Sequence, residues 1–599
     1  MKTTFPEAVY TAEISSLNIQ RKKVQQQKEW ISWGRLAAIL AAIAALYFLW
    51  SSSTPLAISI ALVCTAIFLR LVVIAVNVSA KLQNLNRLIA INEQELKTEA
   101  GRYFDLFNGA EFQPAVHAYA NDLDIFGRAS VYQFINRAMS GQGRKTLAEW
   151  LLQPAGTEEI LQRQQAVKVL QAQYQWRQEL QAHSAAEPVT IGTQQKINDW
   201  LQQEQSFFTH GAWQLVRIIG PAIIIAITAF YIADKLETKW FNLALLVFFL
   251  FTGYISKKAT VAYNTLTKIA PEIATLSKTI YHIENQTFTS GWLQRNQAHF
   301  TDGQKTASVS VKTLNGILGR LDIRLNPVLF LPINILLFWD LQQMLAFEKW
   351  KKTNKEHIMN WFNAAGEMEA LSSLSTLAFN HPTWAFPEMA ENHGTYLATE
   401  LGHPLIPFQK RVNSTFTMEE TGQIAVITGS NMAGKSTFLR SIGLSLVMGM
   451  AGAPVCAVSA RFSRMPVMSS MRISDNLEES TSTFYAELKK LKSIIEAVKR
   501  KEKVFLLLDE ILRGTNSLDR HTGSKALIQQ LIKEDASGII ATHDLELAEL
   551  ITTYPVNIHN YHFDVQVANE ELFFDYALKD GICQSLNASI LMKKIGIEM

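Results

Sequence analysis

The sequence predicts an α/β domain at the C-terminal end of the chain, preceded by a mostly helical region that carries two apolar helical hairpins. Two observations lead to this prediction. After about residue 400, short β-rich runs such as "IAVIT" and "VFLLL" alternate with helical segments, as expected of a parallel sheet. Before that point, Gln, Leu, Ala, Lys and Glu recur at helical spacing, and two pairs of apolar runs interrupt them.

The length of 599 residues exceeds what one hydrophobic core organises, because such cores stop growing at roughly 250 to 300 residues. We therefore expect several units, which we place at 1–31 (polar N-terminal segment), 32–80 (first apolar hairpin), 81–400 (helical domain, interrupted by a second hairpin at about 214–256) and 401–599 (α/β domain).

Charge and cysteine content exclude some classes of protein. The 56 basic and 53 acidic residues leave a net charge of +3, which gives no strong positive field of the kind that announces a nucleic-acid partner. The three cysteines, Cys64, Cys456 and Cys583, are far apart and show no CxxC spacing. Neither a disulfide framework nor a zinc site is expected, and a reducing compartment fits.

Four apolar runs predict two membrane-spanning hairpins. Leu36–Trp50 and Pro55–Val76 are joined by a short Ser/Thr link and contain one charged residue, Arg70. Ile218–Ala233 and Trp240–Ile255 are joined by "DKLETK", with aromatic residues near their ends as at a membrane interface. The uninterrupted runs are shorter than the ~20 residues that a bilayer normally needs, so hairpins buried in a soluble protein stay an alternative.

The flanking charges predict the orientation in the membrane. Basic residues precede the first hairpin, follow it and bracket the second: Arg21, Lys22, Lys23, Lys28, Arg35, Lys81, Arg87, Arg217, Lys257 and Lys258. The positive-inside rule then places the helical and α/β domains in the cytoplasm, with the chain a multi-pass protein of the inner (cytoplasmic) membrane. A further apolar stretch, Pro327–Trp339, holds two prolines and is too short to span, so we expect it to be buried or interfacial.

A phosphate-binding loop is predicted between a strand and a helix. "GSNMAGKS" fits GxxxxGK[ST], follows the expected strand Ile424–Thr428 and precedes the apolar helical segment Phe438–Met450. Backbone N–H groups at the helix N-terminus would cradle the phosphates of ATP, Lys435 would neutralise β- and γ-oxygens, and the Ser436 hydroxyl would coordinate Mg²⁺. The expected nucleotide-binding residues are Gly429, Ser430, Asn431, Met432, Ala433, Gly434, Lys435, Ser436 and Thr437.

Two later strands supply the expected catalytic groups. "VFLLLDE" ends in Asp509 and Glu510 where a buried strand reaches the edge of the sheet. We expect Asp509 to hold the metal and Glu510 to polarise the attacking water. His543 ends another apolar strand, where it would orient or sense the γ-phosphate. An acidic pair after an apolar strand is common by itself, but together with the phosphate loop it predicts a Mg²⁺-dependent ATPase.

The segment 479–495 has two interpretations. Its Ser/Thr-rich turn runs into an amphipathic helix with Phe484, Leu488, Leu491 and Ile495 on one stripe. The turn either acts on the nucleotide of a second subunit or simply caps a helix that faces the core. The spacing leaves both interpretations open.

Together, "TGSNMAGKST", "STSTF", "LLLDEILRGTNSLD" and "ATHD" resemble the ATPase domain of the MutS family of mismatch-repair proteins. Upstream, "INRAMSGQGRKTLAEWLLQP" resembles the start of the family's helical core and lever domain, and "GHPLIP" its approach to the ATPase. Downstream, "FDYALKDGICQSLNASILMKKIGI" resembles the closing segment of the family. The likeness covers about residues 120–599 and is interrupted by the second hairpin.

The resemblance implies ATP and Mg²⁺ as ligands of the residues named above, with Glu510 as the catalytic carboxylate and His543 as the γ-phosphate sensor. It also implies a homodimer with composite ATP sites, in which Ser482 completes the site of the partner subunit. Tyr576 falls near the place where the family has a side chain that contacts adenine.

The chain also departs from the family. The region before the helical domain holds a polar segment and a hairpin in place of a mismatch-reading domain, and the "FPE" near the N-terminus has no domain around it. Leu512 stands where the family has glycine. We therefore expect a membrane-tethered, MutS-like ATPase whose dimer is a DNA-binding clamp related to mismatch repair, and these departures count against the reading of mismatches. The alternative is a membrane mechanochemical or transport-like ATPase that binds no DNA, although the chain has no LSGGQ signature and only one charge within its apolar runs.

Overall fold

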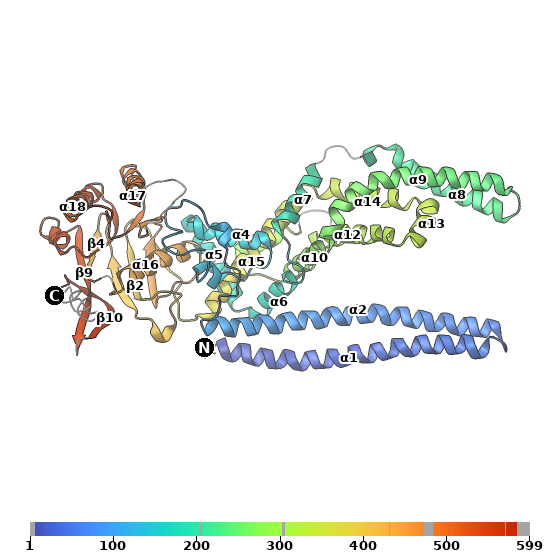
Figure 1. Cartoon of the computed structure of the whole chain (residues 1–599), viewed down its shortest axis with the longest axis horizontal. Helices are drawn as coiled ribbons and strands as arrows, with labels where there is room; N and C mark the ends of the chain where they lie inside the picture. The colour runs from blue at the N-terminus through green and yellow to red at the C-terminus, as the bar shows by residue number, and fades with distance from the viewer. Residues whose placement is uncertain are drawn as a thin grey trace.

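The computed structural model describes residues 6–202, 207–301, 306–430, 432–472, 483–568 and 571–583. The molecule is elongated: the α/β domain forms one end, and two helical hairpins reach toward the other (Figure 1). The helices before the α/β domain are α1 (Pro6–Leu49), α2 (Thr54–Glu99), α3 (Val131–Ile135), α4 (Gly141–Leu152), α5 (Thr157–Gln171), α6 (Tyr174–Ser184), α7 (Ile191–Gln202), α8 (Ala212–Ile232), α9 (Thr238–Leu266), α10 (Ala270–Glu284), α11 (Gly291–Ala298), α12 (Ala307–Leu321), α13 (Pro327–Leu337), α14 (Trp339–Asn354) and α15 (Ile358–Asn380).

The first hairpin is a long antiparallel pair formed by α1 and α2. It is longer than the sequence predicted, because α1 continues without a break from the expected polar segment into the first apolar run. Apart from Pro6 at its first position, the residues that α1 buries recur every seven positions, which is the spacing of a coiled-coil seam. They are Tyr10, Leu17, Val24, Ile31, Ala38 and Ala45. The apolar halves of α1 and α2 pack on each other and leave their outer faces exposed.

The second hairpin consists of α8 and α9. Together with α1 and α2 these helices are the four in the described part of the chain that are long and apolar enough to cross a membrane. The third apolar stretch forms α13, which is bent by 75° against α14. The sequence predicted that this stretch is buried or interfacial. Most of α13 is exposed, because the neighbouring helices cover only one side of it, so it is not a buried helix.

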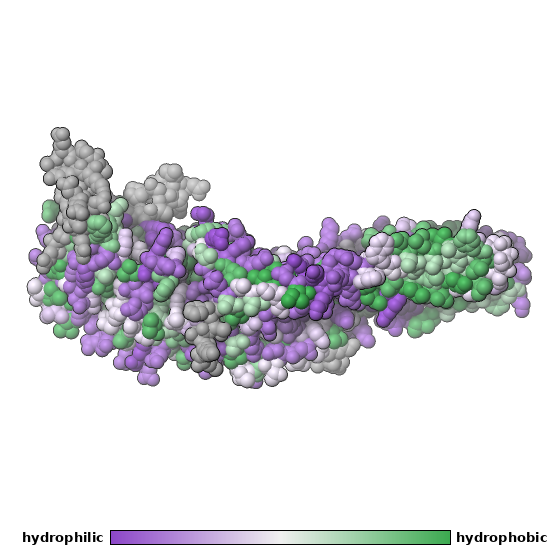
Figure 2. Space-filling view, turned by 90° about the horizontal axis from the view of Figure 1, so that it is seen from below, coloured by the Kyte–Doolittle hydropathy of each residue, from purple (hydrophilic) through white to green (hydrophobic). Residues whose placement is uncertain are grey.

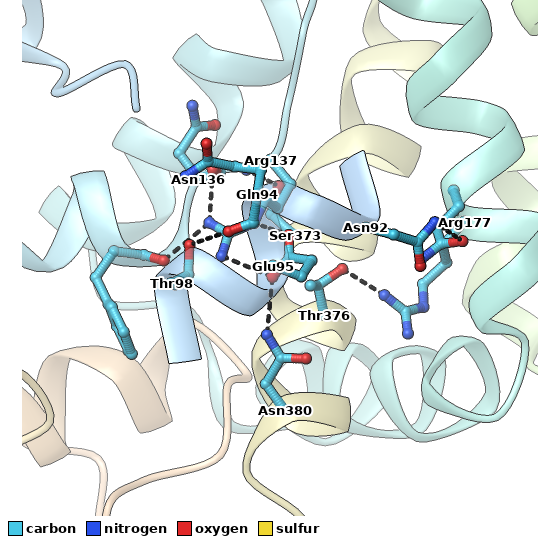
Figure 3. Close-up of polar contacts among 12 residues, drawn as sticks. Asn92, Gln94, Glu95, Thr98, Asn136, Arg137, Arg177, Ser373, Thr376 and Asn380 are labelled. Carbon is cyan, nitrogen blue, oxygen red and sulfur yellow. Dashed lines mark hydrogen bonds and ion pairs between the residues drawn. The ribbon is translucent and has the colours of Figure 1, made fainter. Parts of the chain in front are cut away.

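A cluster of buried polar residues joins the first hairpin to the helical domain (Figure 3). Arg137 pairs with Glu95 of α2, with a distance of 3.0 Å from Nη2 to Oε2 and a second contact through Nε. Asn380 of α15 donates from Nδ2 to Glu95 Oε2 at 2.9 Å and accepts a hydrogen bond from the Tyr10 hydroxyl of α1 at 2.6 Å. The Arg137 backbone N–H donates to the Ser373 hydroxyl of α15. The N-terminal end of α1 and the C-terminal end of α2, which lie away from the apolar tip of the hairpin, are thus both bound to α15.

The α/β domain contains two sheets. A six-stranded sheet has the order β10-β9-β4-β8-β7-β6 and is parallel except for the β9–β10 pair, and a four-stranded sheet has the order β1-β5-β2-β3. The strands are β1 (Glu388–Ala390), β2 (Tyr396–Leu401), β3 (Ser414–Met418), β4 (Ile424–Thr428), β5 (Ser459–Ser463), β6 (Val467–Ser470), β7 (Phe505–Asp509), β8 (Ser537–Thr542), β9 (Ile558–Ala568) and β10 (Glu571–Asp580).

Helices cover both faces of the six-stranded sheet. They are α16 (Lys435–Met450), α17 (Thr483–Lys499) and α18 (Ser517–Lys533). Ala425 and Ile427 of β4 belong to the cluster that includes α16, whereas Ile424 and Val426 belong to the one that includes α17 and α18. Because successive strand residues point to opposite faces, one continuous apolar run serves both layers. The carboxyl ends of β4, β7 and β8 then meet at one edge of the sheet.

Candidate functional site

The phosphate loop lies between β4 and α16. Gly429 and Gly434 have φ angles of 145° and 108°, values that favour glycine. A Cβ at Gly429 would lie 2.8 Å from the Phe563 carbonyl oxygen, so a larger residue would also collide with β9. The loop opens onto the N-terminus of α16, whose free N–H groups favour an anion.

The other predicted loop residues take different positions. Ser430 has a buried hydroxyl without a hydrogen-bond partner within the described residues, Met432 is exposed and Ala433 is fully buried. Thr437 lies in the first turn of α16, beside a cavity described below. Asn431, which the sequence also assigned to the loop, lies outside the described residues, as does Ser482.

Lys435 is buried at the first position of α16, with its ammonium group folded over the loop. Nζ donates to the carbonyl oxygens of Gly429 and Ser430 at 2.6 and 3.0 Å, and it lies 3.8 Å from Glu510 Oε1. Burial lowers the pKa of Lys435, and the carboxylates of Glu510 and Asp509 act in the opposite direction. A positive charge is thereby held at the mouth of the loop.

Ser436 and Asp509 bring two oxygen ligands together at the end of β7. The Ser436 hydroxyl donates to Asp509 Oδ2 at 2.5 Å. Burial raises the pKa of Asp509, while the hydrogen bond from Ser436 and the charge of Arg513 lower it. Hydroxyl and carboxylate oxygens are the ligands that Mg²⁺ prefers, so this pair fits the ion that the sequence predicts.

Glu510 follows directly and faces both Lys435 and His543. His543 Nδ1 lies 3.5 Å from Glu510 Oε1, which is a long contact. This contact is the largest influence that lowers the pKa of Glu510, and the charges of Lys435 and Arg513 add to it, whereas burial opposes them. These contacts favour the charged form of the Glu510 carboxylate, the form that can accept a proton.

Arg513 is a member of the site that the sequence reasoning missed. Its Nη2 donates to the Asp509 carbonyl oxygen at 2.9 Å and its Nε to the Glu510 carbonyl oxygen at 3.0 Å. Its guanidinium nitrogens also lie 3.6 Å from both carboxylates. A basic residue three and four positions after an acidic pair was the signal available in the sequence.

The loop between Glu510 and Arg513 is tied to α17. The Leu512 N–H donates to Glu487 Oε1 at 2.5 Å, and burial raises the pKa of Glu487. Leu512 has a φ of 61° and Glu510 one of 48°, so two residues that are not glycine take the left-handed conformation here. Such strain gathers at sites where the surrounding contacts fix the backbone.

A cavity of about 240 Å³ lies beside the phosphate loop and has Tyr576 in its wall. Gly434 and Tyr576 adjoin each other, because a Cβ at Gly434 would lie 3.3 Å from Tyr576 Cδ1. His403, Arg411 and Thr437 also line the cavity, which has apolar side chains of Phe438 and Phe563 in its wall. Of these residues, the sequence reasoning named Tyr576 and Thr437.

Comparison with known proteins identifies the domain that holds this site. Residues 425–594 match the family MutS domain V. The C-terminal part of the chain is a MutS domain V. This domain is an ATPase domain of the ABC type, so the prediction of an ATPase is confirmed.

Several curated proteins are similar to between a third and two fifths of the chain. The chain is 30% identical over 248 residues to the DNA mismatch repair protein MutS of Thermotoga petrophila, covering 41% of this chain and 31% of that protein. It is 31% identical over 206 residues to the DNA mismatch repair protein MSH4 of Arabidopsis thaliana, covering 33% and 25%. It is 32% identical over 244 residues to the human MutS protein homolog 4, covering 39% and 25%. The chain thus spans no more than about a third of the length of these relatives.

A buried carboxylate connects the MutS domain V to the helical region. Asp122 Oδ2 accepts hydrogen bonds from the Ser469 hydroxyl at 2.6 Å and from Lys490 Nζ of α17 at 2.5 Å. The backbone N–H groups of Met471 and Arg472 also donate to Asp122. The MutS domain V therefore meets the helical region through the end of β6 and through α17, the helix that also holds the loop after Glu510.

Proposed function

We propose that the chain is a Mg²⁺-dependent ATPase tethered to a membrane, whose dimer closes around DNA. The observation that supports ATP hydrolysis is the gathering of Lys435, Ser436, Asp509 and Glu510 at the carboxyl edge of the sheet, within the domain that matches MutS domain V.

In this proposal the phosphates of ATP lie on the N–H groups at the start of α16, and Lys435 neutralises their charge. Ser436 and Asp509 would hold Mg²⁺, which when bound supplies positive charge to the phosphate oxygens. Glu510 accepts the proton of the attacking water, and its lowered pKa keeps it ionised near neutral pH. His543 orients Glu510 from the end of β8.

The adenine base is assigned to the cavity that Tyr576 lines. The cavity adjoins Gly434 and Thr437, so a nucleotide whose phosphates lie on the loop reaches it without crossing the protein. Its aromatic and apolar walls suit the faces of a base, and its polar side chains suit the edge.

The membrane tether is supported by the surfaces of the four long helices. At most 17% of the most apolar window of each helix is buried, so most of the side chains in these windows are not covered by protein. The tips of both hairpins lie at the same end of the molecule, far from the ATPase domain (Figure 1). A continuous band of hydrophobic surface lies at that end, whereas hydrophilic and hydrophobic residues are mixed over the rest of the visible face (Figure 2). A patch of this kind supports a membrane contact, and the flanking basic residues support a cytoplasmic position of the ATPase.

DNA binding and dimerisation are supported by the relatives, two of which are named DNA mismatch repair proteins. The proposed ligand is DNA, and mismatch recognition is not part of the proposal. A homodimer follows from the resemblance, with Ser482 completing the partner's ATP site.

A second function is a mechanochemical ATPase that acts on the membrane without DNA. The buried cluster around Glu95 and Arg137 favours it, because this cluster fixes the first hairpin to α15. Movement of the helical domain would then be passed to the hairpin, whatever the ligand.

The rate of ATP hydrolysis separates the two functions. It is measured on the full chain in detergent with homoduplex, mismatched or branched DNA or with none, and Glu510→Gln serves as the blank. Stimulation by DNA that fades as salt rises supports the clamp, because phosphate contacts release counterions. Hydrolysis that no DNA alters refutes the clamp and leaves the membrane function. Wild-type hydrolysis no faster than that of Glu510→Gln contradicts the assignment of the site.

A further inference from the structure

Helix α13 buries a polar residue and exposes apolar ones, which is the reverse of an amphipathic helix in a soluble protein. Its one buried residue is the polar Asn334. In contrast, Leu325 just before it is 76% exposed and Val328 within it is 81% exposed, and Leu329 and Leu331 are exposed as well. A helix in water turns its apolar stripe inward and its polar residues outward. The inversion indicates surroundings that are themselves apolar.

The exposed apolar residues lie on several sides of α13. Val328, Leu329 and Leu331 point in different directions, because successive residues of an α-helix are turned by about 100°. A second protein would cover one face of such a helix, whereas lipid acyl chains surround it. No charged residue occurs between Arg324 and Asp340, the two residues that flank the segment.

Those two charges are neutralised at the base of the helix. Arg324 donates from Nε and Nη2 to the two carboxylate oxygens of Asp340 at 2.8 and 2.6 Å. The Ser256 hydroxyl of α9 donates to Asp340 Oδ2 at 2.5 Å, and Asn334 Nδ2 donates to the Ser256 oxygen at 3.0 Å. Asn334 Oδ1 also accepts from the Asp340 N–H at 3.1 Å. The buried side of α13 is thus fixed to the second hairpin by a complete set of polar contacts.

The backbone at the ends of α13 is also provided with partners. Asn326 caps the N-terminus by accepting from the Leu329 N–H, and Pro327 has no N–H to satisfy. At the other end, Phe338 takes a left-handed conformation with φ 52°, and its N–H donates to the Asn334 carbonyl oxygen. Backbone groups need such partners in hydrocarbon, where water is absent.

Length and position set how far α13 can reach. Its 11 residues extend about 16 Å, roughly half of the ~30 Å hydrocarbon core, so it cannot cross a bilayer alone. Phe338 packs against Phe248 and Phe251 of α9 with ring centroids 5.8 Å apart. A Cβ at Gly220 of α8 would lie 2.6 Å from the Phe338 ring, so α13 is closely joined to the second hairpin.

We propose that α13 is a half-inserted membrane helix that lies among the acyl chains of the cytoplasmic leaflet beside the second hairpin. The proposal rests on the membrane tether proposed above. Arg324 and Asp340 then lie near the membrane surface, where the chain turns by 75° from α13 into α14 and back to the helical domain.

Spin labels in the full chain test the proposal. Val328→Cys is labelled in α13, Leu250→Cys in α9 and Val309→Cys in α12, each in a background with Cys64→Ser; all three positions are exposed. The chain is reconstituted in vesicles of phosphatidylcholine and phosphatidylglycerol. Accessibility to oxygen, which enters the hydrocarbon, is compared with accessibility to a charged nickel chelate, which does not.

We expect the oxygen-to-nickel accessibility ratio at Val328 to approach that at Leu250 and to exceed that at Val309 several-fold. A nickel-accessible Val328 with a lipid-exposed Leu250 refutes the inserted helix and leaves the tether intact. A nickel-accessible Leu250 refutes the tether itself. A Val328 label shielded from both reagents, with spin–spin broadening that unlabelled chain removes, overturns the proposal in favour of a contact between two copies.

Discussion

The left-handed conformation of Leu512 gives a prediction with a defined sign. Leu512 has φ 61° in the loop that follows Asp509 and Glu510. This conformation costs a residue with a Cβ roughly 1 to 2 kcal/mol, and glycine does not incur the cost. Leu512→Ala and Leu512→Gly both remove the side chain that packs against α18, so the lost packing nearly cancels when the two variants are compared.

The Gly variant should therefore be more stable than the Ala variant by about 1 kcal/mol, which is the reverse of the usual order. For a domain of 150 to 250 residues, this difference corresponds to about 2 to 4 °C in the unfolding midpoint. The midpoint is measured by thermal unfolding of the full chain in detergent, with loss of ATP hydrolysis as the readout.

Ala526 is the matched control, because it is exposed in the middle of α18. There Ala526→Gly should lower stability by about 1 kcal/mol, as expected at a helical φ. If Leu512→Ala is as stable as Leu512→Gly while Ala526→Gly behaves as expected, the left-handed backbone at residue 512 is wrong, and so is the argument from it.

Four further outcomes follow from the same contacts. Glu510→Gln should leave nucleotide binding intact and lower turnover by about 10² to 10⁴, as measured by phosphate release; unchanged turnover would remove Glu510 from its role. Lys435→Ala should weaken nucleotide binding itself, seen with a fluorescent ATP analogue, and normal affinity would contradict the loop assignment. His543→Gln removes the main influence that lowers the pKa of Glu510, so that pKa rises and the acid limb of kcat/KM shifts to higher pH; an unmoved limb argues against the contact. Arg137→Met leaves the Glu95 carboxylate buried and unpaired, which should cost about 3 to 5 kcal/mol in thermal unfolding and be partly restored by adding Glu95→Leu; no loss would mean that water reaches the pair.

The core of the site was predictable from the sequence because each part is local. The phosphate loop, Asp509, Glu510 and His543 each end or follow a recognisable apolar strand, and parallel strands bring their carboxyl ends to one edge. The structure brings Lys435 close to Glu510, and the match to MutS domain V confirms the kind of domain.

Other parts depend on contacts that sequence spacing does not reveal. The cavity beside the loop draws His403 and Arg411 from a segment before β4 and Tyr576 from β10, so no single window of sequence contains it. The buried pair of Glu95 and Arg137 likewise joins helices that are distant in the chain. The seven-residue spacing of α1 is visible in the sequence, but it continues across the predicted boundary between the polar segment 1–31 and the apolar hairpin 32–80.

The polar half of the first hairpin sets the distance between the membrane surface and the ATPase, and therefore how much of the electrostatic potential of the lipids reaches the nucleotide site. From Val76, where the apolar run ends, to Glu99, α2 continues for about 35 Å at 1.5 Å per residue. The Debye length at physiological ionic strength is about 8 Å, so this spacing exceeds four Debye lengths. In a tethered molecule, the negative potential of anionic lipids would therefore decay before it reached the nucleotide site. Polyanions such as DNA or ATP could approach that site without electrostatic repulsion from the bilayer.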